Sequence, residues 1–144
     1  MQKAHLRPGL SGLSDNIAVV SIIDRFLEHS RIFYFRHGGD ERVFISSADW
    51  MPRNLDRRLE LFVPVEDRNG RERLITVLKT TFTDRVKGRR IQSDGGFSRV
   101  PEVELDQALG SQETLYRAAQ EAVREAERSQ RLVFVPHRAP GSEV

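Results

Sequence analysis

Two short runs of β-branched and aromatic residues, separated by a pair of glycines, constrain this chain more than any other feature. Residues 31–35 read RIFYF and residues 43–45 read VFI, compositions that favour extended strands. Between them lies the stretch 37–40, HGGD, and consecutive glycines supply the positive φ angles that a tight hairpin turn needs. The sequence therefore predicts a β-hairpin, around which the rest of the chain has to be arranged.

Helices and further strands are predicted on both sides of this hairpin, from the spacing of apolar residues. The predicted helices are residues 14–29, residues 71–82 and a stretch that starts near Ser111. The further strands are residues 59–65, 84–91 and 97–100, with turns at residues 67–70 and 94–96. Pro52 disfavours helix just before it, and residues 53–58 form a compact basic segment. The expected fold class is α/β, with a small mixed β-sheet flanked by helices.

A chain of 144 residues is the size of one ordinary domain. We expect residues 1–13 to be an irregular lead-in, residues 14–130 the folded domain, and residues 131–144 a flexible tail. No apolar run approaches the roughly 20 residues that cross a bilayer, so no transmembrane segment is predicted. The chain has no cysteine, which excludes disulfides and cysteine-based zinc sites. We therefore expect a cytoplasmic protein, with peripheral attachment to a membrane left open.

The basic residues are almost all arginine, with twenty arginines and three lysines. A guanidinium stays charged and binds phosphate oxygens through two parallel hydrogen bonds. Genomic base composition can produce the same excess, so only clustered arginines count toward a phosphate site. The net charge of +2 does not indicate a polybasic tail, and we expect no nucleic-acid partner.

The clustered basic residues lie near a small polar loop. His29 precedes the first strand of the hairpin, and Arg31 points to the same side as His29 if the segment is extended. The loop Ser46-Ser47-Ala48-Asp49 follows the second strand and supplies two short hydroxyl groups. The remaining basic residues of this stretch are Arg53, Arg57 and Arg58. Fixed positive charge, short donors and an imidazole that exchanges protons near neutral pH suit a phosphate site.

Each of these residues also has an ordinary structural explanation. A histidine at a helix end is often a capping or surface residue, and serine-rich loops are common. Arg57 and Arg58 would point to opposite sides of a strand, so at least one would be solvated or paired with Asp56 or Glu60. Spacing alone therefore leaves open an arginine-rich module that binds phosphate groups through charge without catalysis.

Several runs of the sequence resemble the C-terminal part of bacterial polyphosphate kinase. They are LRPG at 6–9, LSDNI at 13–17, FLEHSR at 26–31, SSADWMPRNLDRR at 46–58, DRVK at 84–87, SRV at 98–100 and SQETLY at 111–116. The resemblance extends from about residue 5 to residue 116. Its two central runs, at 26–31 and 46–58, are long and specific.

This resemblance implies an activity, a cofactor and partners. Members of the family transfer the γ-phosphoryl group of ATP reversibly to a growing polyphosphate chain, with Mg²⁺, and their two C-terminal domains resemble phospholipase D halves. The resemblance thus implies a phospholipase D-like half-domain that meets ATP or ADP, inorganic polyphosphate and the remaining domains of the same enzyme, in a homo-oligomer. The sequence offers no carboxylate cluster for an all-protein Mg²⁺ site, so the metal is expected to arrive with ATP.

The resemblance also assigns roles to single residues. His29 matches the second of two family histidines, which lines the nucleotide-phosphate pocket and would donate a hydrogen bond or a proton there. The first histidine, which becomes phosphorylated, belongs to the preceding half and would lie before Met1. Arg58 matches an arginine that reaches the ATP phosphates as a charge clamp. Weaker candidates for phosphate binding are Arg31, Arg53, Ser46 and Ser47.

The sequence departs from the phospholipase D pattern at one informative point. That pattern follows its histidine with a lysine and then an aspartate, whereas this chain has Arg31 and then Arg36. A phospholipase D-like hydrolase is therefore disfavoured. The first four residues do not resemble the family, and a non-catalytic module that binds polyphosphate or nucleotide is the alternative function.

Overall fold

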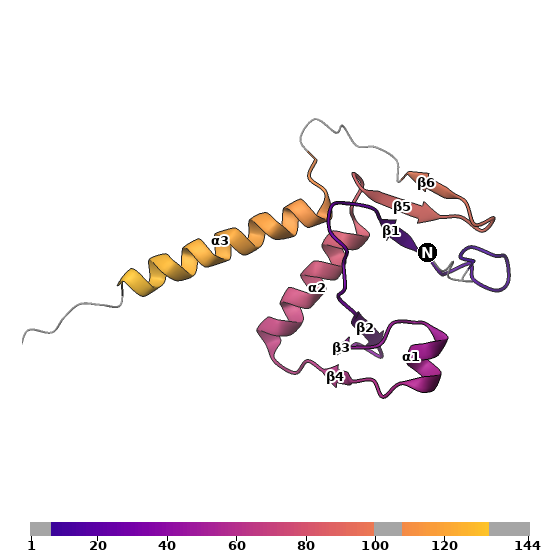
Figure 1. Ribbon diagram of the computed structural model, residues 1–144, viewed down its shortest axis with the longest axis horizontal. Helices are drawn as coiled ribbons and strands as arrows, with labels where there is room; N and C mark the ends of the chain where they lie inside the picture. The colour runs from indigo at the N-terminus through magenta and orange to yellow at the C-terminus, as the bar shows by residue number, and fades with distance from the viewer. Residues whose placement is uncertain (1–6, 100–107, 133–144) are drawn as a thin grey trace, which may run out of the picture.

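The computed structural model describes residues 7–99 and 108–132, and the predicted α/β class is confirmed (Figure 1). The elements are β1 Val20–Ile22, β2 Ile32–His37, β3 Asp40–Ser46, α1 Pro52–Arg57, β4 Phe62–Pro64, α2 Arg68–Phe82, β5 Gly88–Ile91, β6 Phe97–Arg99 and α3 Ser111–Leu132. The strands form two three-stranded sheets, β1-β5-β6 and β2-β3-β4, rather than one sheet. Every pairing in these two sheets is antiparallel.

The predicted hairpin is confirmed as β2 and β3. The two strands pair from Ile32 opposite Ile45 to His37 opposite Asp40. Gly38 and Gly39 close the turn with φ angles of 56° and 98°, a conformation that residues with a Cβ rarely adopt. The predicted third strand is confirmed as β4, which pairs with the other edge of β3.

The two faces of the β2-β3-β4 sheet carry different apolar groups. Val43 lies on one face opposite Tyr34 and is only 1% exposed. The other face carries packed aromatic rings, with 5.0 Å between the ring centroids of Phe33 and Phe62 and 4.6 Å between those of Phe44 and Phe62. Val43 is the one buried hydrophobic residue in the described part of the chain, so the apolar core of this domain is small.

The predicted helix over residues 14–29 is wrong. Val20–Ile22 forms β1 instead, and Val20 pairs with Arg90 of β5. The hydroxyl of Ser14 donates to the carbonyl of Arg7 at 2.7 Å and accepts from the N–H of Leu10 at 2.9 Å, which closes a turn. Residues 19–23 read VVSII, and such a concentration of β-branched residues favours a strand when a partner strand is available to pair with it.

The strand predicted over residues 84–91 is confirmed only from Gly88 onward. Asp84 bends the chain before it, because its Oδ1 accepts the N–H groups of Val86 and Lys87, both at 2.8 Å. The predicted turn at residues 94–96 and the strand that follows are confirmed, with β6 paired to β5. Asp84 therefore sets where β5 begins.

The helices differ from expectation in their bounds and packing. Residues 53–57 of the basic segment are helical, in α1, and Arg58 follows in an extended conformation. Helix α2 begins at Arg68, where Asp67 caps it by accepting the N–H of Gly70 at 2.6 Å. The start of α3 at Ser111 is confirmed, and Val123 on this helix is 58% exposed. Figure 1 shows α3 extending away from both sheets.

Two expectations reach beyond the described residues. Residues 1–6 of the predicted lead-in and residues 133–144 of the predicted tail lie outside them, and α3 continues to Leu132. In the described ranges, no helix has the length and apolar character required to cross a membrane.

Candidate functional site

His29 lies in an irregular segment shortly before β2, two residues from Arg31. The guanidinium of Arg31 faces the imidazole, with Nη1 3.0 Å from His29 Nδ1 and Nη2 3.1 Å from His29 Nε2. The same Nη1 donates to the carbonyl oxygen of His29 at 3.2 Å. The structure therefore brings these two predicted residues together on one side of the chain.

Asp49 fixes the orientation of Arg31. The Nε atom of Arg31 donates to Asp49 Oδ1 at 2.6 Å, and the side chains are 17% and 36% exposed. A guanidinium carries only donors, and a neutral imidazole has a single lone pair, so Arg31 can make a hydrogen bond to just one ring nitrogen in either tautomer. The other ring nitrogen then carries the ring hydrogen of the neutral imidazole.

Glu60 organises a second group of polar residues around α1. Its carboxylate accepts from the Ser47 hydroxyl and from Asn54 Nδ2, the latter at 2.9 Å, and lies 3.4 Å from Arg58 Nε. Asn54 is 3% exposed, so its amide needs such a partner. Arg58 follows the last residue of α1 in an extended conformation and is 60% exposed. This group connects the β3–α1 loop, α1 and the chain entering β4.

The local sequence explains why these residues form a short helix. Pro52 occupies the first position of α1, where a missing N–H costs nothing and the fixed φ angle suits a helix. The N–H of Asn54 donates to the carbonyl of Met51 at 2.9 Å. The helix ends at Arg57, Arg58 continues in an extended conformation, and both arginines are exposed.

Both predicted serines already use their hydroxyl hydrogens within the loop. Ser46 donates to the carbonyl of Leu61 at 2.9 Å, and Ser47 donates to Glu60. A phosphate group accepts hydrogen bonds, so either serine would have to exchange its present partner to bind one. Arg53 is exposed on α1, close enough to Asp49 to lower the pKa of that carboxyl.

Both carboxylates of the site are held in their charged form. The hydrogen bond from Arg31 lowers the pKa of Asp49, and the charges of Arg31, His29 and Arg53 act in the same direction. The hydrogen bond from Ser47 lowers the pKa of Glu60, helped by Asn54 and by the charges of Arg58 and Arg31. Glu60 thus lies near both arginines, which makes the two groups one continuous cluster.

Sequence reasoning assigned no role at the site to four residues that support this cluster. Asp49 and Asn54 lie inside the run at 46–58, and their polar character there was a usable signal. Glu60, just beyond that run, was weighed only as a possible partner of an arginine. Gln112 donates from Nε2 to the carbonyl of Phe26 at 2.8 Å, three residues before His29, and no local pattern indicates this contact.

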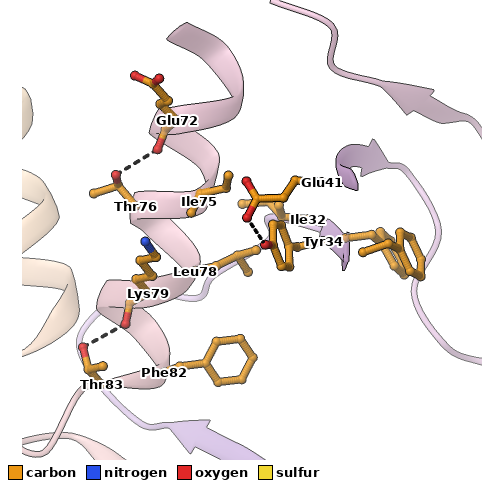
Figure 2. A pocket seen from close by; sticks show the side chains of 12 residues that line it. Ile32, Tyr34, Glu41, Glu72, Ile75, Thr76, Leu78, Lys79, Phe82 and Thr83 are labelled. Atoms are coloured by element: carbon orange, nitrogen blue, oxygen red, sulfur yellow. Dashed lines mark hydrogen bonds between the residues drawn. The ribbon is translucent and has the colours of Figure 1, made fainter. Parts of the chain in front are cut away.

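An apolar groove lies apart from the cluster (Figure 2). It has a volume of about 760 Å³ between α2 and the hairpin, where Ile75 and Leu78 face Ile32 and Tyr34. The hydroxyl of Tyr34 donates to Glu41 Oε1 at 2.7 Å. With few donors on its walls, this groove suits apolar contact rather than phosphate binding.

A metal ion finds no ready site made of protein groups alone. Across residues 7–99 and 108–132, no three His, Cys, Asp or Glu side chains are grouped so that they could hold a metal. Asp49 and Glu60 are each engaged by arginine. The residues present fit a phosphate anion rather than a bare cation.

Comparison with known protein families decides the relationship of this chain. The family model described as polyphosphate kinase C-terminal domain 2 matches residues 2–112. The chain belongs to the polyphosphate kinase family. The resemblance in the runs at 26–31 and 46–58 is therefore confirmed.

Polyphosphate kinases from several bacteria are similar to this chain. The Rhodopirellula baltica polyphosphate kinase is 50% identical over 133 residues, which cover 92% of this chain and 16% of that protein. The Pseudomonas aeruginosa polyphosphate kinase is 48% identical over 110 residues, which cover 76% of this chain and 16% of that protein. The chain thus spans about a sixth of the length of the relatives it matches.

A solved polyphosphate kinase has the same fold in this region. The crystal structure of polyphosphate kinase from Porphyromonas gingivalis superposes with a TM-score of 0.69 at 39% sequence identity. The match covers 76% of this chain and 17% of the other. The arrangement of the two sheets and α2 is therefore that of a polyphosphate kinase domain.

Proposed function

We propose that this chain supplies one half of the ATP-phosphate site of a polyphosphate kinase, built as a phospholipase D-like half-domain. The observation that carries the proposal is that the family match spans the stretch in which His29, Arg31 and Arg58 gather around two carboxylates. A donor-rich, arginine-lined surface of this kind suits the phosphates of ATP and polyphosphate.

The proposed reaction is phosphoryl transfer through a phosphohistidine in the preceding half of the enzyme. A nitrogen of that imidazole attacks the γ-phosphorus of ATP, forming an N–P bond while the bond to the β–γ bridging oxygen breaks and ADP leaves. A terminal oxygen of polyphosphate then attacks the same phosphorus, and the N–P bond breaks. The reverse sequence returns the phosphoryl group to ADP.

The residues of this chain would hold the phosphates while the transfer takes place. Arg58 would bind the phosphate oxygens as a bidentate clamp and stabilise the charge that develops on them. His29, with its ring oriented by Arg31, would donate a hydrogen bond or a proton to the same phosphates. Arg53, Ser46 and Ser47 are secondary candidates at the rim of the cluster.

Mg²⁺ would enter this site together with the nucleotide. Bound Mg²⁺ neutralises phosphate charge and is commonly held through substrate phosphates with few protein ligands.

The proposal is tested first on this chain by NMR titration with Mg-ATP and, separately, with polyphosphate at near-physiological salt. We expect chemical-shift changes concentrated at His29, the loop 46–49 and Arg58. Arg117 provides a matched control, because it is an exposed arginine on α3 that pairs with Glu113 at 2.7 Å, far along the chain from the cluster. Arg117→Ala should leave the titration unchanged.

Diffuse shifts that fade with salt would contradict the proposal and favour the non-catalytic, charge-binding module. In a complete polyphosphate kinase that carries this domain, His29→Ala should lower turnover by about a hundredfold or more, the usual loss when one positioned donor is removed. Near-normal turnover of that variant would rule out the role assigned to His29.

A further inference from the structure

The segment that leads to His29 is held from the far end of the chain. Gln112, the second residue of α3, meets Phe26 at a sequence separation of 86 residues. The N–H of Phe26 donates to Gln112 Oε1 at 3.0 Å, and Gln112 Nε2 donates to the carbonyl of Phe26 at 2.8 Å. One carboxamide therefore satisfies both backbone groups of one residue.

This contact reproduces the hydrogen bonding of a neighbouring strand. A carboxamide has the donor and acceptor of a peptide group, and two residues that exchange both bonds are the unit of an antiparallel ladder. Along residues 23–30, no backbone-to-backbone hydrogen bond joins the segment to the rest of the described chain. Gln112 thus supplies what a paired strand would have supplied to this stretch.

We call the two hydrogen bonds between Gln112 and Phe26 the clamp. The start of α3, which carries Gln112, is itself fixed to the body of the domain. The N–H of Ser111 donates to Asp84 Oδ2 at 2.6 Å, and the other oxygen of Asp84 binds the chain entering β5. Asp84 is buried, and burial raises the pKa of its carboxyl less than these N–H groups lower it, so the pKa lies below its ordinary value. The start of α3 cannot shift without breaking this charged anchor.

We propose that Gln112 is a positioning residue for His29. It fixes the backbone three residues before His29, while Arg31 fixes the ring from the residue two positions after it. Two fixed points leave the intervening chain little conformational freedom, which holds the imidazole of His29 in position to contact a bound phosphate. The inference rests on the proposed function, since it assumes that His29 contacts phosphate.

The clamp is tested on the chain without ligand. Gln112→Ala removes both hydrogen bonds and keeps a good helix former at that position. We expect amide hydrogen exchange at Phe26 to accelerate by about tenfold or more, and ¹⁵N relaxation to show increased motion at residues 26–30. Gln120→Ala is the matched control, because Gln120 lies on the same helix and contacts only the hydroxyl of Tyr116, at 2.9 Å.

A second variant keeps the test decisive if Gln112→Ala does not fold. Gln112→Glu keeps the acceptor for the N–H of Phe26 but places a carboxylate against the Phe26 carbonyl and against Glu28, which Gln112 now contacts at 3.2 Å. We expect faster exchange at Phe26 for this variant as well. Exchange as slow as in the unmodified chain, in either variant, would overturn the clamp.

Mg-ATP titration then separates the clamp from the proposed function. If Gln112 positions His29, Gln112→Ala weakens Mg-ATP binding several-fold, and His29→Ala combined with it adds little further loss. Unchanged binding by Gln112→Ala, with weaker binding by His29→Ala, would overturn the positioning role and leave the proposed function intact. Unchanged binding by both variants, despite faster exchange, would overturn the proposed function and the positioning role while leaving the clamp as a structural contact.

Discussion

Two arginine–carboxylate pairs bracket α1, and they are built differently. Arg31 donates to Asp49 at 2.6 Å and is 17% exposed, whereas Arg58 lies 3.4 Å from Glu60 and is 60% exposed. The Nη1 and Nη2 atoms of Arg31 contact the ring of His29, while Arg58 has no such second contact with the described residues. One arginine is therefore part of the framework, and the other is free to move to a ligand.

This difference indicates how a phosphate site can be both rigid and available. A donor that is already held in place orients its neighbours but has little left to offer an incoming phosphate. A loosely paired surface arginine gives little stability, because exposed ion pairs contribute on the order of 0 to 1 kcal/mol, and so it exchanges partners readily. We therefore assign orientation of His29 to Arg31 and phosphate capture to Arg58.

The largest expected effect comes from Arg58→Ala. Mg-ATP binding to the chain should weaken by about ten- to a hundredfold, the range for losing one or two charge-assisted hydrogen bonds. The melting temperature should stay the same, since Arg58 is itself 60% exposed and its Nε lies as far as 3.4 Å from Glu60 Oε1. Isothermal titration calorimetry with Arg117→Ala as the reference checks this. Equal losses of Mg-ATP affinity in the two variants would show that Arg58 acts only through its charge, like any surface arginine, and not as a specific phosphate ligand.

Asn54→Ala should affect stability more than binding. Asn54 is 3% exposed and donates to Glu60, so its loss leaves the carboxylate with one partner fewer and opens space beneath α1. We expect the free energy of unfolding to fall by about 1–2 kcal/mol, measured by urea denaturation. Asn69→Ala, at an exposed position of α2, is the control and should change it by less than about 0.5 kcal/mol. A similar loss in both would show that Glu60 does not organise this region.

Protonation of Asp49 at low pH should break its ion pair with Arg31. The folded-state pKa of Asp49 lies below the ordinary value of 3.8, so the pair contributes stability above that pH and loses it as pH falls through the lower, folded value. Between pH 7 and pH 5 the contribution of Asp49 to the melting temperature should therefore be constant. Below about pH 4 it should fall more steeply in the unmodified chain than in Asp49→Asn. Parallel curves for the two proteins would mean that Asp49 is not held by Arg31 in solution.

Prediction from sequence succeeded where neighbouring residues decide the structure. The hairpin follows from two strand-forming runs around Gly38 and Gly39, and α3 begins at Ser111, the residue near which its start was predicted. It failed at residues 14–29, because pairing with β5, about seventy residues later, outweighed a helical spacing of apolar residues. The same limit applies to the site. His29, Arg31 and Arg58 came from local patterns and a family resemblance, whereas the contact between Gln112 and Phe26 depends on how distant segments pack.

The smallest expected effect on binding comes from Ser46→Ala, and it sharpens the contrast between held and available donors. The Ser46 hydroxyl donates to Leu61 O at 2.9 Å and accepts from the N–H of Ala48 at 3.0 Å, so it closes the loop that carries Asp49. Its removal should lower the free energy of unfolding by about 0.5–1.5 kcal/mol and change Mg-ATP affinity by less than about twofold. Calorimetric titration beside a urea melt measures both quantities. A loss of affinity as large as that of Arg58→Ala would show that the loop releases Ser46 to bind phosphate, and that donors engaged in the free protein also belong to the binding site.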